Sequence, residues 1–319
     1  MKRALAALAV AAAAACTRAP PAVAPIRLYV APGLPGERVA ELARGFQIAS
    51  PMLVDRIDDA EVAWLTDPSA ALALGDRAAA GSAPEQPGLP GEFADPKRRF
   101  APVGAVARVI VTLAGDAPAF APDELRELAD PRLRGKVAIA RLDRRPGAQL
   151  VAALALGHGE RGVGGWLDRL AENRPILVES DAEVVARVVA GTAQVGLTDS
   201  LTAGGSARRE ALRVVFPDQA GKGCVAIPTA LVVLPGASSA ARKFSAWLAG
   251  PIAEQVLVDR IFGLLPLRAE ATAPAGLEPL WRLSVLELDW SSLAEGEDRW
   301  LVRLRGWPSP SAGGVRQGR

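Results

Sequence analysis

The sequence is poor in the side chains that hold metal ions and carry out covalent catalysis. Its 319 residues include one histidine, one tyrosine, two cysteines and two methionines, and aromatic residues make up 5% of the chain. The chain therefore has too few histidines and cysteines for metal sites built on histidine or thiolate, for disulfide frameworks and for histidine-dependent triads. We expect no catalytic residues, no metal ligands and no cofactor.

An excess of positive charge is also missing. The chain has 37 Lys and Arg against 35 Asp and Glu, and loss of Lys2 and Arg3 with a leader peptide would leave 35 of each sign. Proteins that bind phosphate backbones need clustered positive charge, so we expect no nucleic-acid partner. A half-apolar chain of this length excludes disorder and fibrous repeats and is long enough for two α/β lobes.

The N-terminus carries an apolar run that is too short to span a bilayer. After Lys2 and Arg3, residues 4–15 are twelve Ala, Leu and Val, whereas a membrane-spanning helix needs about 20 apolar residues. This length fits the core of a signal peptide, predicted at residues 1–15. Small residues precede Cys16 as in a bacterial lipobox, although Ala13 replaces the usual leucine.

We expect lipidation of Cys16, with residues 16–25 as the lipidated cysteine and a Pro/Ala tether. This would place the protein at the periplasmic, extracytoplasmic face of a bacterial membrane. The alternative is an ordinary secretory cleavage site with an incidental cysteine.

Short apolar strands alternate with amphipathic helices, which predicts an α/β fold with parallel sheet and crossover connections. Pro146 and Gly147 open one helix, and Ser180 with Glu183 forms a capping box before another. The strands are expected at residues 26–30, 61–65, 103–113, 136–140, 176–178, 195–198, 213–216 and 224–234. The helices are expected at residues 37–46, 146–156, 166–172, 238–249 and 252–261, followed by a Trp-bearing tail. The helix that follows the Ser180 cap is expected to bear Val184, Val185, Val188 and Val189 and to end at Gly191.

Two long strands, at residues 103–113 and 224–234, bracket a self-contained α/β block. A chain that leaves one lobe, builds a second and returns has this order, and the two crossing strands act as a hinge beside a cleft. We therefore assign residues 26–110 plus 229–319 to an N-terminal lobe with a C-terminal tail, and residues 111–228 to the second lobe.

Several segments resemble a known family. Residues 130–140, DPRLRGKVAIA, look like the DPRWKGKVALA segment of bacterial extracellular solute-binding proteins of the ferric-iron type, the periplasmic components of ABC importers. Further segments of the same family are matched in the same order along the chain, at residues 60–68, 195–200, 214–219 and 277–290. The resemblance therefore covers roughly residues 26–293. It implies the two-lobed periplasmic-binding-protein fold of the second topological type, with two mixed or parallel sheets flanked by helices and joined by two hinge strands.

The sequence departs from that family where its iron binders carry paired tyrosines. Residues 198–204 contain no tyrosine, and Tyr29, the one tyrosine of the chain, lies inside the first strand. Iron(III) prefers anionic oxygen ligands, so tyrosinate-type iron binding is not expected here. The first lobe is also abbreviated, because only fourteen residues separate Phe46 from Glu61, where the family fits a further strand and helix.

Ligands of open α/β sheets sit beyond the carboxyl ends of strands, facing helix N-termini. The resemblance adds Arg108, on a hinge strand where the family often places an arginine that meets an anion. The predicted ligand-binding residues are Pro32, Gly33, Thr66, Asp67, Arg108, Arg145, Gly147, Ala148, Thr198, Asp199 and Ser200. For Asp67 the alternative role is a helix cap, and for the arginines it is solvation or a structural ion pair.

Two other features are not interpreted as functional. Residues 157–162 match G-x-G-x-x-G but follow a helix, whereas a dinucleotide site needs a strand, a turn and a helix. His158 is interpreted as a loop residue, and Cys224, at the start of an apolar strand, as a buried inert thiol.

The sequence therefore predicts a lipid-anchored substrate-binding protein of an ABC importer. We expect it to be a monomer that closes on a small polar or anionic solute, performs no chemistry and delivers the solute to a membrane permease. The alternative is a degenerate relative that no longer transports and acts as a membrane-tethered interaction or sensory protein. The third and least favoured hypothesis is an extracytoplasmic enzyme.

Overall fold

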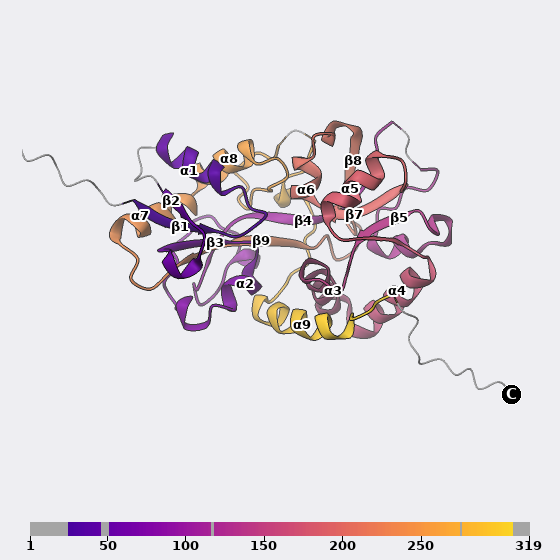
Figure 1. Ribbon diagram of the computed structural model, residues 1–319, viewed down its shortest axis with the longest axis horizontal. Coiled ribbons are helices and arrows are strands. Elements are labelled where there is room, and N and C mark those ends of the chain that lie inside the picture. The colour runs from indigo at the N-terminus through magenta and orange to yellow at the C-terminus, as the bar shows by residue number, and fades with distance from the viewer. Residues whose placement is uncertain (1–24, 46–50, 116–117, 275, 309–319) are drawn as a thin grey trace, which may run out of the picture.

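The computed structural model describes residues 25–45, 51–115, 118–274 and 276–308. The predicted signal peptide, Cys16 and most of the tether lie outside these residues. Figure 1 shows an elongated molecule of two lobes, with strands β4 and β9 running lengthwise between them. Within the described residues, no helix combines the length and the apolar character that crossing a bilayer requires.

The strands form a mixed sheet in the order β2-β1-β3-β9-β4-β7-β5-β6, and β8 also pairs with β4. Pairs within each lobe are parallel, except for those with β4 and β9, which are antiparallel. The strands are β1 (Ile26–Val30), β2 (Pro51–Val54), β3 (Val62–Leu65), β4 (Ala101–Leu113), β5 (Val137–Ala140), β6 (Ile176–Val178), β7 (Val195–Asp199), β8 (Leu212–Val215) and β9 (Ala226–Val233).

Strand β4 belongs to both lobes. Its first half pairs with β9, and its second half pairs with β7 and β8. The β4–β9 register shifts between Pro102 and Ala105, where Gly104 has φ +64°. A side chain at Gly104 would meet Leu264 at 2.7 Å, so both the backbone conformation and the space require glycine.

Helices cover both faces of the sheet. They are α1 (Gly36–Gly45), α2 (Pro68–Leu72), α3 (Arg145–His158), α4 (Glu160–Glu172), α5 (Asp181–Val189), α6 (Ser200–Gly205), α7 (Ser239–Leu248), α8 (Pro251–Arg260) and α9 (Trp290–Arg303). Short 3-10 turns lie at Ile57–Asp59, Gly75–Arg77, Gly91–Phe93, Leu125–Ala129, Pro131–Leu133, Arg209–Ala211 and Leu280–Arg282.

Side-chain caps start several of these helices at the positions that the sequence predicts. Asp67 accepts the Ala70 N–H at the start of α2, and Ser180 accepts the Glu183 N–H at the start of α5. Caps of this kind stabilise a helix by about 1 kcal/mol each, which makes such helix starts readable from local sequence.

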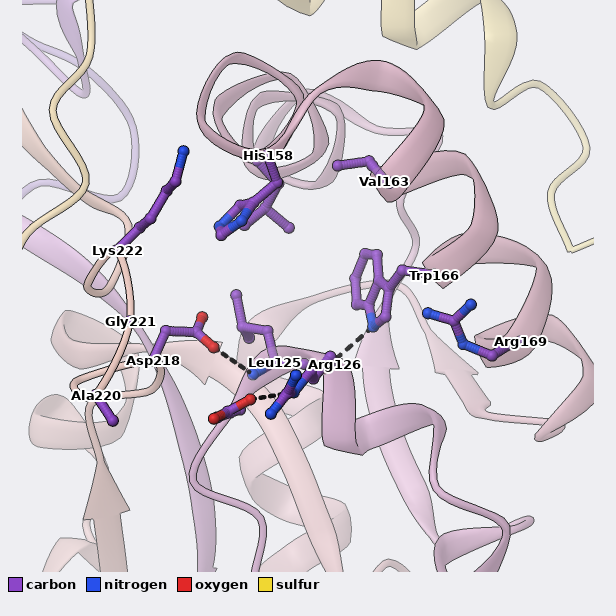
Figure 2. Close-up of a pocket in the computed structure, with 13 residues that line it drawn as sticks. Leu125, Arg126, His158, Val163, Trp166, Arg169, Asp218, Ala220, Gly221 and Lys222 are labelled. Carbon is purple, nitrogen blue, oxygen red and sulfur yellow. Dashed lines mark hydrogen bonds and ion pairs between the residues drawn. The ribbon is translucent and has the colours of Figure 1, made fainter.

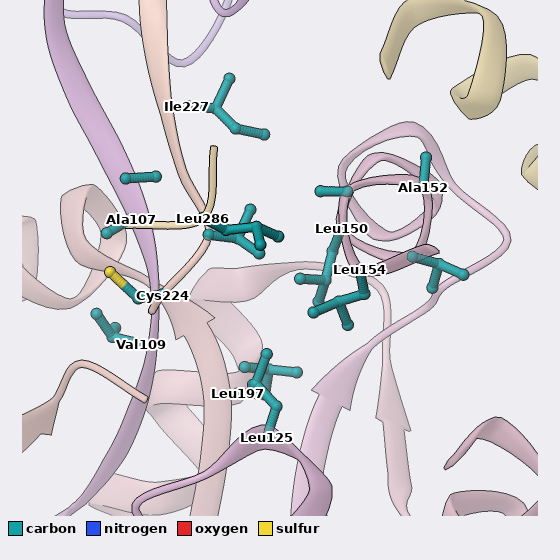
Figure 3. Packing of buried hydrophobic residues seen from close by; sticks show 14 of the residues in the cluster. Ala107, Val109, Leu125, Leu150, Ala152, Leu154, Leu197, Cys224, Ile227 and Leu286 are labelled. Atoms are coloured by element: carbon teal, nitrogen blue, oxygen red, sulfur yellow. The ribbon is translucent and has the colours of Figure 1, made fainter. Parts of the chain in front are cut away.

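Buried apolar residues form two clusters. The smaller cluster belongs to the first lobe and includes Trp64, whose Nε1 donates to Thr229 Oγ1 at 2.8 Å. The larger cluster fills the second lobe and continues toward β3 and α2. Figure 3 shows Cys224 inside it, beside Ala107 and Val109 of β4. The thiol is fully buried, and burial raises the pKa of Cys224 to about 12, as an inert thiol requires.

Helix α9 is the main element that the sequence did not predict. It lies along α3 and also reaches α2, so the C-terminal segment contacts both lobes, whereas we had assigned it to the N-terminal lobe (Figure 1). Gly296 faces α3, since a Cβ at this position would lie in ordinary van der Waals contact with Ala152, at 3.4 Å. Trp290, Leu293 and Trp300 form its buried face.

Candidate interlobe binding cleft

A cavity of about 620 Å³ lies between the two lobes, beside the hinge strands β4 and β9. It is lined by Gly33, Leu34, Thr66, Asp67, Ala70, Ala73, Val106, Arg108, Arg145, Pro146, Gln149, Asp181, Asp199, Leu201, Thr202, Val225, Ile227 and Glu297. The first lobe, the second lobe and α9 all contribute to this wall. Its volume falls in the range of about 300–1,000 Å³ that small-molecule sites occupy.

Six of the predicted ligand-binding residues line this cleft. They are Gly33, Thr66, Asp67, Arg108, Arg145 and Asp199. Their role in ligand binding stays a prediction.

The other five predicted residues do not line the cleft. Pro32 is exposed next to Gly33, and Gly147 lines an adjoining hollow of about 190 Å³ that shares Arg108, Pro146 and Asp181 with the cleft. A Cβ at Gly147 would lie 2.5 Å from the Leu142 Cα, so this glycine allows α3 to start against the end of β5. Ala148 is fully buried within α3.

Thr198 and Ser200 are fully buried on either side of Asp199. Thr198 Oγ1 donates to the Asp181 carbonyl at 3.3 Å. The hydroxyl of Ser200 accepts the Ala107 N–H and donates to the Gly263 carbonyl at 2.7 Å. Successive side chains of a strand point to opposite sides, which directs Asp199 to the cleft and Thr198 into the protein, whereas Ser200 is the buried first residue of α6.

On the second lobe, Arg108 is bonded to a carboxylate that the sequence analysis did not select. Its Nη1 lies 3.0 Å from both carboxylate oxygens of Asp181, and its Nη2 donates to the Pro146 carbonyl at 3.1 Å. Burial alone lowers the pKa of Arg108, but Asp181 and Asp199 raise it above its ordinary value. Asp181 is the first residue of α5, directly after the Ser180 cap, and this position is its only sequence signal.

Asp199 ends β7 and caps α6. Its two carboxylate oxygens accept the Thr202 N–H at 2.7 Å and the Thr202 hydroxyl at 2.9 Å. Burial raises the pKa of Asp199, and the nearby charge of Asp181 raises it further, against the effect of Arg108. This carboxylate is therefore held in place by polar bonds while its charge is incompletely balanced.

The first lobe presents Thr66 and Asp67 at the end of β3. Asp67 accepts the Ala70 N–H at 2.9 Å and the Thr66 hydroxyl at 2.7 Å. The capping role proposed for Asp67 is confirmed by the first of these bonds. Each Asp67 oxygen accepts one bond, which leaves a second lone pair on each for a ligand.

Helix α9 closes one side of the cleft with Glu297, which sequence reasoning missed. The carboxylate accepts Arg145 Nη1 at 2.8 Å and Gln149 at 3.4 Å, and Arg145 also bonds Asp298 at 2.9 Å. Burial raises the pKa of Glu297, and the charge of Asp67 raises it further. The Glu297 side chain is 3% exposed. The packing of α9 buries it, and no sequence motif marks this position, so the sequence alone does not identify it.

A second pocket of about 510 Å³ lies on the second lobe alone, beside α3, α4 and the loop after β8 (Figure 2). Three of its polar groups bond to neighbouring protein atoms: Asp218 accepts the Leu125 N–H at 3.1 Å, Trp166 donates to the Leu125 carbonyl, and Lys222 donates to the Gly157 carbonyl. Residues from a single lobe cannot couple binding to lobe closure, so the interlobe cleft is the stronger candidate.

The features that sequence analysis set aside lie away from the cleft. The glycine-rich residues 157–162 connect α3 to α4, so no strand precedes them and the dinucleotide reading is excluded. His158 is the exposed last residue of α3 and lines the second pocket, whereas we had expected a loop residue. Tyr29 lies in β1 and does not line the cleft.

The fold and the cleft define a two-lobed binding protein of the periplasmic type. Residues 78–293 match the family of bacterial extracellular solute-binding proteins, and the chain belongs to this family. No curated protein matches the sequence.

Solved structures confirm the fold. The ferric binding protein of Campylobacter jejuni has a TM-score of 0.73 and 15% identity, covering 88% of this chain and 98% of its own. Iron-bound HitA of Pseudomonas aeruginosa has a TM-score of 0.74 and 15% identity, covering 88% and 99%. The Trichodesmium protein IdiA (FutA), in complex with iron and citrate ligands, has a TM-score of 0.74 and 18% identity, covering 89% and 100%. At these identities the likeness defines the fold and leaves the ligand open.

In the described ranges, no group of three or more His, Cys, Asp or Glu side chains is arranged to hold a metal ion.

Proposed function

We propose that this protein is the substrate-binding component of an ABC importer. It is held at the extracytoplasmic face of a bacterial membrane by a lipid on Cys16, carries a small polar solute in the interlobe cleft and performs no chemistry on it. Membership of the solute-binding family supports the general role. The observation that carries the proposal is that both lobes supply polar side chains to one cavity, with Asp67 on one side and Arg108 and Asp199 on the other.

Binding in such a cleft is coupled to lobe closure by population shift. A solute that contacts both Asp67 and Asp199 makes its full set of bonds only when the lobes are close together. The closed form therefore gains stability in proportion to the solute's differential affinity for the two forms. A permease that recognises both lobes at once would then receive mainly loaded protein.

A thermal-shift screen tests this function. The panel contains metal ions, phosphates, sulfonates, carboxylates, amino acids and organic amines. A bound solute at 100 times its dissociation constant adds about 2.7 kcal/mol of stability, which is visible as a raised melting temperature. If no class of compound raises the melting temperature, the proposal is wrong, and the alternative of a membrane-tethered protein that carries no solute gains support.

A further inference from the structure

The charges that line the cleft are unequal in number. Four carboxylates, those of Asp67, Asp181, Asp199 and Glu297, face the cavity together with two guanidinium groups, those of Arg108 and Arg145. The formal charge of the lining is therefore two negative charges. The fold determines where the cleft lies, and the excess of negative charge in its lining determines which class of solute it favours.

Both arginines are already bonded to carboxylates. Arg108 is paired with Asp181, and each of these side chains is 14% exposed. Arg145 is paired with Glu297 and with Asp298. An anionic solute that displaced Asp181 or Glu297 from these guanidinium groups would leave a buried carboxylate without its partner, which is costly.

The remaining two carboxylates lie on opposite lobes. Asp67 and Asp199 are bonded to backbone N–H groups and to threonine hydroxyls, and neither forms an ion pair with any residue that the structure describes. Their charges repel each other when the lobes approach, and this repulsion opposes closure of the empty cleft. A positive group placed between them removes that opposition and bonds to both lobes.

We propose that the transported solute is an organic cation whose protonated amine or quaternary ammonium group lies between Asp67 and Asp199. This inference rests on the proposed function. The cavity of about 620 Å³ has room for an organic body, and the apolar side chains of Leu34, Val106 and Ile227 are placed to contact its carbon atoms. The sequence alone favoured a polar or anionic solute, because it identified Arg108 and Arg145 but not the carboxylates that pair with them.

Isothermal titration calorimetry on the full chain tests the inference. The probes are organic cations (1,4-diaminobutane, choline and arginine methyl ester), anions (phosphate, succinate and citrate) and a neutral sugar, glucose. We expect binding of at least one cation, with affinity that falls as salt is raised, because screening shortens the reach of charges to about 10 Å at 0.1 M. We expect no binding of the anions.

Two variants remove the charge and keep the fold. Asp67→Asn and Asp199→Asn each place an asparagine at a helix N-cap, where it is as good as aspartate. Each is expected to weaken cation binding by about tenfold or more. The matched controls are Asp76→Asn and Asp168→Asn, which change exposed aspartates outside the cleft, one on each lobe, and should leave affinity unchanged.

The outcomes separate the inference from the proposed function. Cation binding that both cleft variants weaken, and both controls leave intact, supports the inference. Cation binding that neither cleft variant affects overturns it, and so does binding of an anion alone, which leaves the proposed function standing. If no probe binds here and none binds in the thermal-shift screen, both proposals fail together.

Discussion

Replacing Arg108 by methionine should destabilise the protein through the two carboxylates that it leaves behind. Arg108→Met keeps the length of the side chain but removes both bonds to Asp181 and the bond to the Pro146 carbonyl. Removal of one partner from a buried ion pair costs about 3–5 kcal/mol. Because each partner is 14% exposed, we take the lower end, about 3 kcal/mol. For a chain of 319 residues that unfolds as one unit, this corresponds to a melting temperature lowered by about 5 °C.

The loss should depend on pH in a defined direction. Arg108 balances Asp181 on α5 and Asp199 at the end of β7. Burial already raises the folded-state pKa of Asp199, and loss of Arg108 raises it further, so the destabilisation is complete at pH values above the raised pKa. It shrinks as the pH falls through that pKa, because protonation removes the repulsion. The deficit should therefore be larger at pH 8 than at pH 5.

Thermal unfolding followed by tryptophan fluorescence measures both effects. Arg187→Met, on the exposed side of α5, is the matched control and should change stability by less than about 0.5 kcal/mol. In the double variant Arg108→Met with Asp181→Leu, much of the loss should be recovered, since no unpaired charge of the pair remains. A single variant no less stable than the control, or a deficit that does not change with pH, would refute this account of the cleft.

Three further predictions concern the framework around the cleft. Cys224, whose pKa burial raises to about 12, should resist iodoacetamide at pH 8.5 until the protein is denatured; mass spectrometry of its peptide checks this, and prompt alkylation would contradict it. Gly263→Ala should lower the melting temperature far more than Gly276→Ala. Both glycines have a positive φ, but only at position 263 would an alanine Cβ lie 2.0 Å from a backbone oxygen of α6. Equal melting temperatures for the two variants would show that this contact is unimportant. Asp95→Ala should lower the free energy of unfolding by about 3 kcal/mol at pH 7. Despite burial, the Arg99 bonds hold the pKa of Asp95 below its usual range, so this loss of stability should fade as the pH drops below about 4. Urea unfolding at several pH values measures it, and a loss independent of pH would argue against the Asp95–Arg99 pair.

Elements with local signals were predicted closely. The Ser180 cap fixed the start of α5, and Pro146 with Gly147 marked the start of α3 within one residue. Helix α9 and the edge strand β2 were missed, because neither carries a strong local pattern. Helix α9 is held by its packing on α3 and α2, which sequence spacing does not reveal.

The candidate site was predicted in part for a similar reason. Thr66, Asp67 and Asp199 follow strands, and the rule that ligands sit beyond carboxyl ends of strands placed them in the cleft. The same rule also selected Thr198, which strand alternation turns away from the cavity, and Ser200, which is buried as the first residue of α6. Glu297 reaches the cleft from a distant segment, so only the tertiary structure brings it there.

The claim at the centre of this account is that one solute bridges the two lobes. A crystal structure of the protein grown with the organic cation that binds most tightly tests it directly. The account predicts density for the cation in the interlobe cavity, with its positive group within hydrogen-bond reach, about 3 Å, of both Asp67 and Asp199. Density confined to one lobe, for example in the pocket beside Trp166, would contradict it.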